Sequence, residues 1–129
     1  EEFPAGMVDR KKNDPVLAAV EEVREELGMD LDSSELIPLN KTPFNTIPSL
    51  TDEVTNFFYF EREVSPEDLL RINGRQTGVA EDNEFMCVKV HPLIDLDSFC
   101  KTLSVFVAGK LLEQHLGRSF LKPVRPLNL

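Results

Sequence analysis

Apolar side chains recur at helical spacing near the start of the chain, between an Asp-Pro pair and a glycine. Asp14 and Pro15 are typical of a helix N-cap and first helical position, and Gly28 is typical of the residue that ends a helix. The apolar stripe between them consists of Val16, Val20, Val23 and Leu27. The pattern therefore predicts an amphipathic helix over residues 15–27.

Two further helical segments follow from the same kind of signal. Ser65 and Pro66 are typical of a helix start and predict a short helix after them. Residues 101–116 carry apolar side chains at helical spacing, and Gly117 is a suitable end. Residues 92–100, between a strand pattern and this helix, predict a short helix or turn.

Alternating and aromatic-rich segments predict the strands. Residues 53–61 alternate and contain four aromatic side chains, which is typical of a β-strand, and residues 84–91 form another. Residues 36–41 predict a strand at a sheet edge or with an irregular path, because of Pro38 and Pro43. Residues 2–7 predict the end of a strand followed by a loop. Polar segments with turn residues separate these elements, at positions 32–35, 42–51 and 73–83.

Composition narrows the class of protein. A chain of 129 residues is about one domain long, and 41% hydrophobic residues are enough to form a core. The net charge of −9 argues against a nucleic acid partner. Cys87 and Cys100 are too few for a disulfide framework and favour reduced thiols, and no segment predicts a membrane span or a secretory signal. We therefore expect a cytoplasmic protein, with an organelle as the alternative.

Four glutamates stand within six positions of the predicted first helix. Three of them, Glu22, Glu25 and Glu26, are three and four residues apart and are expected to cluster beside the apolar stripe. Carboxylate oxygens at this spacing suit Mg2+ or Mn2+, because a divalent cation offsets their mutual repulsion. The alternative is an acidic helix face that is exposed to water.

The sequence around this helix resembles the Nudix hydrolase box. Residues 21–29 are similar to its second half, Arg-Glu-apolar-x-Glu-Glu-x-Gly-apolar, at every place but the first, where Glu21 replaces a basic residue. Residues 4–9 resemble the Pro-Ala-Gly opening of members that act on nucleoside diphosphate sugars. The loop between them is one residue longer than the pattern, and Asn13 stands nearest the early glutamate. The resemblance implies an α/β (α+β) Nudix fold, a mixed β-sheet sandwiched by helices.

The resemblance also implies a metal site and its ligands. The carboxylates of Glu22, Glu25 and Glu26 and the carbonyl oxygen of Ala5 would hold Mg2+, with Mn2+ as the alternative. Gly6 would lie beside the substrate in the same loop. The histidines, His91 and His115, are expected to be structural, and the aromatic side chains around Phe57 are expected to pack in the core.

Two later loops resemble other parts of the family. Pro48, Thr51, Asp52 and Glu53 are similar to a substrate-binding loop of ADP-ribose and ADP-sugar hydrolases, with an ordinary turn as the alternative. Residues 74–85 resemble a loop of ADP-sugar and ADP-ribose pyrophosphatases that supplies a metal ligand or general base. In this loop the candidate residues are Glu81, Asp82 and Glu84, of which Glu84 would also bind metal; the alternative is a solvated acidic turn.

The resemblance predicts an enzyme that hydrolyses the diphosphate bond of a nucleoside diphosphate sugar of the ADP-ribose or ADP-glucose type. A UDP-sugar diphosphatase and a catalytically impaired nucleotide-sugar binding module are the alternatives. Residues 1–116 are expected to form a partial Nudix domain without its N-terminal strands, and residues 117–129 a C-terminal tail that is extended from residue 118. The resemblance further implies a homodimer.

Overall fold

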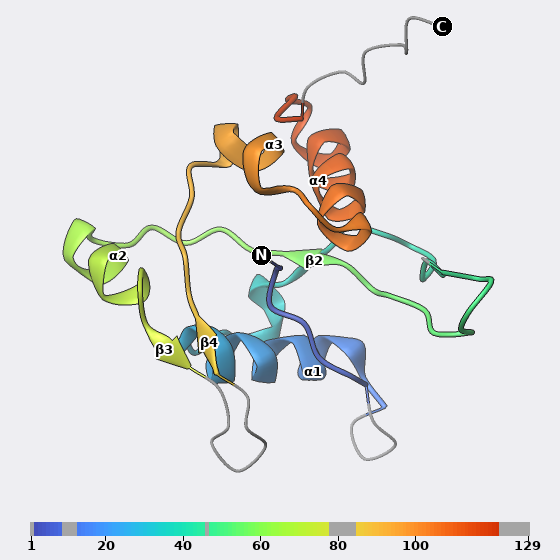
Figure 1. Cartoon of the computed structure of the whole chain (residues 1–129). Coiled ribbons are helices and arrows are strands. Elements are labelled where there is room, and N and C mark those ends of the chain that lie inside the picture. Colours follow the sequence, from blue (N-terminus) through green and yellow to red (C-terminus); the bar gives the residue numbers. More distant parts are fainter. Residues whose placement is uncertain (1, 9–12, 46, 78–84, 122–129) are drawn as a thin grey trace, which may run out of the picture.

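The computed structural model of the chain describes residues 2–8, 13–45, 47–77 and 85–121. Figure 1 shows α1 along one side of the molecule and α3 with α4 on the other, while the segment that contains β2 runs between them. In chain order the elements are α1 (Pro15–Glu22), η1 (Val23–Leu27), η2 (Ser33–Glu35), β1 (Ile37–Pro38), β2 (Phe58–Tyr59), α2 (Pro66–Ile72), β3 (Gln76–Thr77), β4 (Met86–Cys87), η4 (Leu93–Asp95), α3 (Leu96–Phe99) and α4 (Leu103–Leu116). This combination confirms the predicted α+β class. The predicted mixed sheet is not formed by the described residues, whose strands make two separate antiparallel pairs.

The helix predicted over residues 15–27 is confirmed, with one change of geometry. Asp14 caps it by accepting a hydrogen bond of 2.9 Å from the backbone N–H of Val16, and Pro15 occupies the first turn. Gly28 ends it in the left-handed conformation, with φ of 66°. The second half, η1, is a π-helix, which the sequence did not predict. A π-helix turns more widely than an α-helix, so the acids in η1 depart from regular α-helical positions.

The strands are shorter than the alternating pattern predicted. β1 pairs antiparallel with β2, with Ile37 opposite Tyr59, and β3 pairs antiparallel with β4, with Gln76 opposite Cys87. Each strand spans two residues, so the lengths predicted for segments 36–41, 53–61 and 84–91 were wrong as far as the structure describes them. The side chain of Asn40 accepts a hydrogen bond of 2.6 Å from the N–H of Phe57, in place of a continued ladder.

The buried apolar residues form two separate clusters. The first joins the helix of residues 15–27, which we call the box helix, to the turn and strand that follow it. Its buried members are Val23, Leu31 and Leu36. The second joins α3 and α4 to the chain beyond them, and its members are Leu96, Val105 and Leu121. Phe57 is buried and its ring lies 6.5 Å from that of Phe44, so the expected core role of this aromatic segment is confirmed.

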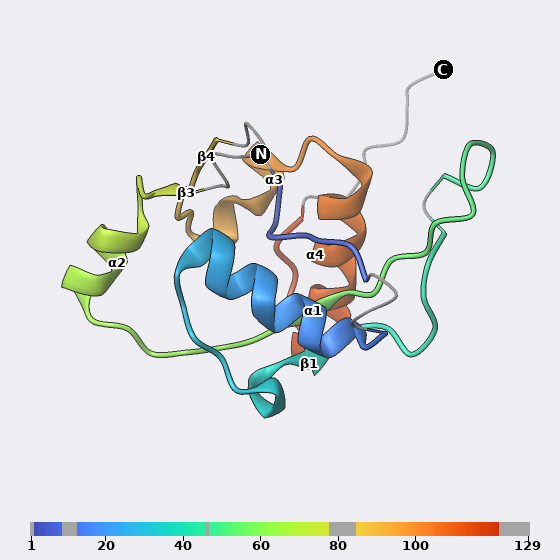
Figure 2. The same cartoon turned by 90° about the horizontal axis from the view of Figure 1, so that it is seen from below.

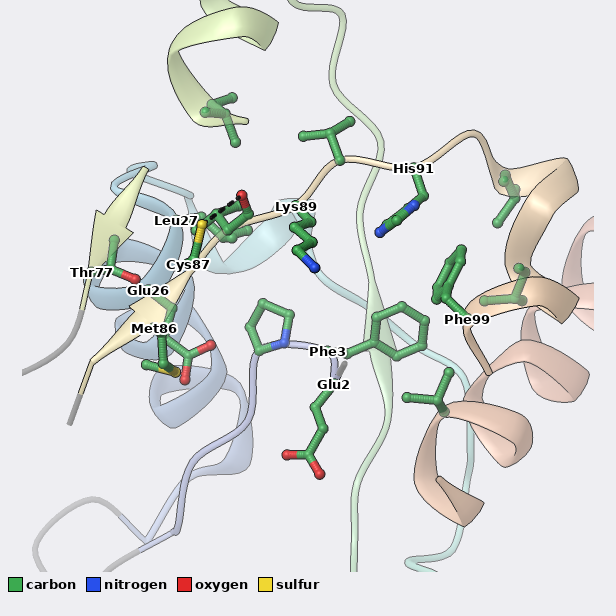
Figure 3. Close-up of a pocket in the computed structure, with 17 residues that line it drawn as sticks. Glu2, Phe3, Glu26, Leu27, Thr77, Met86, Cys87, Lys89, His91 and Phe99 are labelled. Carbon is green, nitrogen blue, oxygen red and sulfur yellow. Dashed lines mark hydrogen bonds between the residues drawn. The ribbon is translucent and has the colours of Figure 1, made fainter. Parts of the chain in front are cut away.

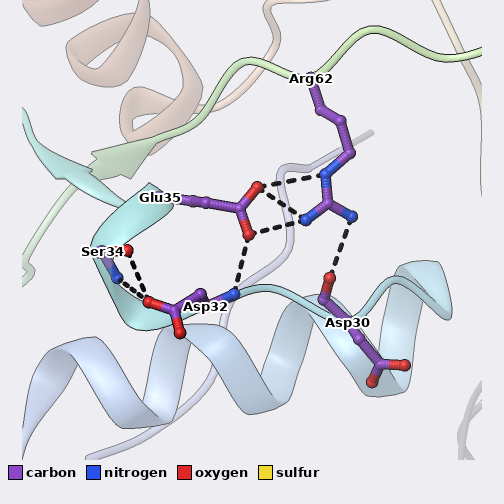
Figure 4. Close-up of polar contacts among 5 residues, drawn as sticks. All are labelled: Asp30, Asp32, Ser34, Glu35 and Arg62. Carbon is purple, nitrogen blue, oxygen red and sulfur yellow. Dashed lines mark hydrogen bonds and ion pairs between the residues drawn. The ribbon is translucent and has the colours of Figure 1, made fainter.

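Arg62 ties the turn after the box helix to the segment beyond β2 (Figure 4). Its guanidinium donates to both carboxylate oxygens of Glu35 at 2.7 Å and to the carbonyl oxygen of Asp30 at 3.0 Å. The Arg62 hydrogen bond, followed by the N–H of Asp32, lowers the pKa of Glu35, and bonds from Ser34 lower the pKa of Asp32. This network fixes the turn that leads from the helix into β1.

Residues 118–121 fold back onto α4, whereas the sequence predicted an extended tail from residue 118. Glu113 accepts hydrogen bonds from the N–H groups of Phe120 and Leu121 at 2.5 and 2.6 Å, and its other oxygen lies 2.6 Å from Lys110 Nζ. Leu121 is 5% exposed and completes the second apolar cluster. Burial of Leu121 and the Glu113 bonds favour this return over extension. Residues 122–129 lie outside the described part of the chain.

We expect Glu113→Gln to lower stability at neutral pH but not at acidic pH. The hydrogen bond from Lys110, followed by the backbone bond from Leu121, lowers the pKa of Glu113 from its ordinary value of 4.5. A lowered folded-state pKa stabilises the fold above the unfolded pKa and loses this effect as pH falls through the folded value. Loss of the charge should cost about 1 kcal/mol, or roughly 3 °C in melting temperature.

Thermal melts of both proteins between about pH 7 and pH 3 check this prediction. The difference in melting temperature should stay constant above about pH 5.5 and shrink below about pH 4.5. A difference that is independent of pH across this range would contradict it. Arg71→Gln, which breaks an exposed pair with Asp68 on α2, is a suitable control.

The remaining structural expectations concern thiols and membranes. Cys87 and Cys100 are not paired with each other, and burial raises the pKa of the Cys100 thiol. In the ranges that the structure describes, no helix combines the length and hydrophobicity required to cross a bilayer.

Candidate functional site

Gly6 lies directly against the carboxylate of Glu22. A Cβ atom added at Gly6 would be 1.7 Å from Glu22 Oε1, so any larger residue here would require this carboxylate to move. The N-terminal segment and the first helix therefore meet at the two residues that the sequence assigned to the substrate and the metal. We call this close approach of the Glu22 carboxylate to Gly6 the Gly6 cradle.

The three predicted metal ligands of the box helix differ in their surroundings. Glu22 and Glu26 are partly buried, whereas Glu25 is exposed. Among the residues that the structure describes, no group of three or more acidic, histidine or cysteine side chains is close enough to hold a metal ion. Glu25 and Glu26 lie in the π-helical part, so their spacing differs from the α-helical one that the prediction assumed.

The predicted ligand atoms are nevertheless of the chemical type that a hard divalent cation prefers. Carboxylate oxygens and a backbone carbonyl are the ligands that Mg2+ prefers, and the Gly6 cradle keeps the Glu22 carboxylate beside the Ala5–Gly6 backbone. Glu84, the predicted fourth acidic ligand, lies outside the described residues together with Glu81 and Asp82. The metal site thus stays a prediction, which the chemical type of the ligands and the contact between Gly6 and Glu22 support.

Glu21, which stands where the Nudix pattern has a basic residue, faces a cation one turn along. Its carboxylate lies 3.5 Å from the guanidinium of Arg24. The Arg24 side chain is 58% exposed, so solvent screens this pair. Arg24 therefore offsets part of the extra negative charge that Glu21 adds to the helix.

The β3–β4 hairpin flanks the segment that carries the predicted general base. Its strand β3 packs against η1. The guanidinium of Arg75 also lies against Gly28, where an added Cβ atom would be 1.8 Å from Arg75 Nη1. The strands on both sides of residues 78–84 are thus fixed next to the end of the box helix. Residues 78–84 themselves lie outside the described part of the chain.

The loop that contains Pro48, Thr51, Asp52 and Glu53 lies elsewhere. Its turn is held by hydrogen bonds from the N–H of Thr51 to the carbonyl of Ile47 and from the N–H of Glu53 to the Thr51 hydroxyl, at 3.1 Å each. All four residues are exposed. Figures 1 and 2 both show this loop on the side of the molecule opposite to β3, β4 and α2. The structure therefore does not bring it to the box helix.

A cavity that the sequence did not predict opens next to Glu26 (Figure 3). Its volume is about 610 Å³, and it lies between the box helix with β4 on one side and α3 with α4 on the other. Glu26 and Thr77 are at one end, where the buried hydroxyl of Thr77 is without a hydrogen-bond partner among the described residues. No local sequence signal identifies it, because its walls come from five separate segments.

The histidines pack against aromatic rings. The His91 ring stacks on Phe99 with centroids 4.4 Å apart, and the His115 ring lies 5.0 Å from that of Tyr59. Both contacts agree with the structural roles that were expected. His91 also lines the cavity, which the sequence did not indicate.

Comparisons with known proteins found a matching family model and a related protein. The family model of the NUDIX domain matches residues 1–110. Nudix hydrolase 14, chloroplastic, from Arabidopsis thaliana is 34% identical over 102 residues, which are 74% of this chain and 33% of that protein. The chain thus spans about a third of the length of that relative. No solved structure matches the chain significantly. Because the family model matches most of this chain, the chain belongs to the Nudix hydrolase family.

Proposed function

We propose that this protein hydrolyses the diphosphate bond of a nucleoside diphosphate sugar, of the ADP-ribose or ADP-glucose type, with Mg2+ or Mn2+. The observation that carries the proposal is the contact between Gly6 and the Glu22 carboxylate, which joins the predicted substrate loop to the predicted metal helix. Nudix membership supports the general reaction, the hydrolysis of nucleoside diphosphate derivatives. The sugar and the base are our inference from the Pro4-Ala5-Gly6 and residue 74–85 motifs.

In this mechanism the chain supplies ligands, a base and a substrate surface. Glu22, Glu25, Glu26, Glu84 and the Ala5 carbonyl would hold the metal. When bound, the divalent ion neutralises diphosphate oxygens and lowers the pKa of a coordinated water.

The proton of the attacking water would pass to a carboxylate in the 81–84 segment. Glu84 is the first candidate for this general base, with Glu81 and Asp82 as alternatives. Attack at one phosphorus breaks its bond to the bridging oxygen and releases a nucleoside monophosphate and a sugar phosphate. Pro48, Thr51, Asp52 and Glu53 would contact the substrate only after their loop moves toward the box helix.

A catalytically impaired nucleotide-sugar binding module is the second candidate, and Glu21 is the observation that favours it. The carboxylate of Glu21 adds a negative charge at a place where the Nudix pattern has a positive one, and solvent screens its pair with Arg24. UDP-sugars remain the alternative substrates.

A substrate panel distinguishes these functions. Phosphate-containing products of ADP-ribose, ADP-glucose and UDP-glucose should be measured with and without Mg2+. Turnover that requires the metal supports the hydrolase, and the preferred substrate identifies its base. Binding of these compounds without any turnover would support the binding module instead and would overturn the proposed reaction.

We expect Glu21→Arg to increase turnover. A guanidinium at this place would offset the negative charge of neighbouring Glu22 and Glu25, which are predicted ligands of the same metal ion. The gain should be about threefold to tenfold in kcat, equivalent to roughly 1 kcal/mol of transition-state stabilisation. Steady-state kinetics over a range of Mg2+ concentrations measure it. Glu67→Arg on α2 adds the same charge away from the site and should leave kcat unchanged, whereas equal effects of both substitutions would exclude a local role for Glu21.

The assembly and the compartment also belong to this proposal. A homodimer stays a prediction, which light scattering at several protein concentrations tests directly. The chloroplastic name of the Arabidopsis relative favours the organellar alternative over the cytoplasmic location expected from composition.

A further inference from the structure

The cavity beside Glu26 is suitable in size for part of a nucleotide sugar. Its volume of about 610 Å³ lies within the range of roughly 300–1,000 Å³ that is typical of small-molecule sites. Its lining is mainly apolar, with a few polar side chains at separate places. Such a combination is expected where an apolar ligand group is buried and its polar end is oriented.

Aromatic rings form the end of the cavity that is nearest α3. Figure 3 shows the rings of Phe3, Phe99 and His91 gathered there around the same space. Phe99 and His91 are stacked with an interplanar angle of 25°, and Phe3 is 43% exposed. Rings with accessible faces are favourable partners for a nucleobase, because every base has a flat π-surface.

A cationic group stands between these rings and the acidic end. In Figure 3 the Lys89 side chain points into the cavity, between the rings and Glu26. A lysine ammonium is a strong phosphate ligand, and the Lys89 side chain lines the cavity while it stays exposed to solvent. Rings, cation and carboxylate thus follow one another in the order of base, phosphate and metal in a bound nucleotide.

We infer that this cavity is the nucleoside subsite of the proposed hydrolase. The base would stack on Phe3 and Phe99, Lys89 would bind the phosphate attached to the ribose, and the second phosphate would extend toward Glu26. This inference rests on the proposed function for the identity of the ligand. It assigns roles in nucleotide binding to Phe3, Lys89 and Phe99, which lie outside the Nudix box.

Metal-free nucleotide binding tests the subsite without any need for turnover. The protein should be labelled with ¹³C at the methionine methyl groups and titrated with AMP, UMP, adenosine and ribose 5-phosphate, followed by NMR. Met86 lines the cavity, whereas Met29 packs against the first apolar cluster and is an internal control. AMP or UMP should shift the Met86 signal and leave the Met29 signal in place, and adenosine should bind about tenfold more weakly than AMP.

Two matched pairs of variants identify the contacts. Phe3→Leu should weaken mononucleotide binding by about fivefold to tenfold, while Phe106→Leu, a similarly exposed ring on α4 outside the cavity, should not. Lys89→Met should abolish the preference for AMP over adenosine, and Lys89→Arg should retain it. Lys101→Met is the control for the loss of one positive charge. Thermal melts show that each variant is folded.

The outcomes separate this inference from the proposed function. If Mg2+-dependent turnover occurs but Phe3→Leu and Lys89→Met leave binding and KM unchanged, the subsite is wrong and the hydrolase stands. If no diphosphate is hydrolysed but mononucleotides still shift Met86 in a Lys89-dependent way, the subsite stands and the reaction is wrong. Equal shifts of Met86 and Met29, or equal binding of AMP and adenosine, would overturn the inference.

Discussion

Glu26→Gln is expected to remove Mg2+-dependent hydrolysis while the fold is retained. The substitution keeps the size and shape of a partly buried side chain but removes the charge that a hard cation requires. A metal ligand contributes several kcal/mol to the transition state, so the expected loss in kcat is about 100-fold to 10,000-fold. The measurement is steady-state hydrolysis of the preferred nucleoside diphosphate sugar over a wide range of Mg2+ concentrations.

Glu63→Gln is the matched control, because it makes the same change at an exposed glutamate beyond β2. It should leave both kcat and the Mg2+ dependence as in the wild type. The melting temperature of Glu26→Gln should stay within about 2 °C of the wild type, since an isosteric change at a partly exposed site has little effect on packing. Wild-type turnover of Glu26→Gln would show that the box helix does not take part in the reaction.

The parts of the fold that depend on neighbouring residues could be predicted from the sequence. Asp14 with Pro15 and Gly28 fixed both ends of the first helix, and Gly117 the end of α4, because a cap acts within one turn. The strand lengths could not be predicted, since a ladder depends on a partner that is distant in the chain. The ion pair of Arg62 with Glu35 joins residues 27 positions apart, and no local pattern indicates it.

The candidate functional site, like the fold, could be predicted from the sequence only in part. The sequence identified Gly6 and Glu22, which the structure places in contact, but the spacing of Glu25 and Glu26 assumed an α-helix where a π-helix forms. The substrate loop at Pro48 was placed by resemblance, and its position on the far side depends on tertiary packing. The cavity could not be found from the sequence because it exists only where separate segments approach without filling the space between them.

Gly6→Ala is expected to lower activity by about 100-fold with little change in stability. The new Cβ would be 1.7 Å from Glu22 Oε1, so the carboxylate must move by roughly 2 Å to regain van der Waals distance. A displacement of that size takes Glu22 out of reach of a metal held by the other ligands, and an error of about 1 Å in a reacting constellation already costs about 100-fold. Gly6 has no positive φ, so alanine fits its backbone and the melting temperature should hold.

The Glu22→Gln background shows whether the effect of Gly6→Ala passes through this carboxylate. If the alanine acts by displacing Glu22, adding Gly6→Ala to Glu22→Gln should reduce kcat by less than about twofold further, because two changes on one interaction are not additive. Mg2+ titrations should show the same pattern, with weaker metal dependence in each single variant and no additional weakening in the double variant. A full 100-fold loss in both backgrounds would mean that Gly6 contacts the substrate independently of Glu22, and the close approach of loop and helix would then serve packing alone.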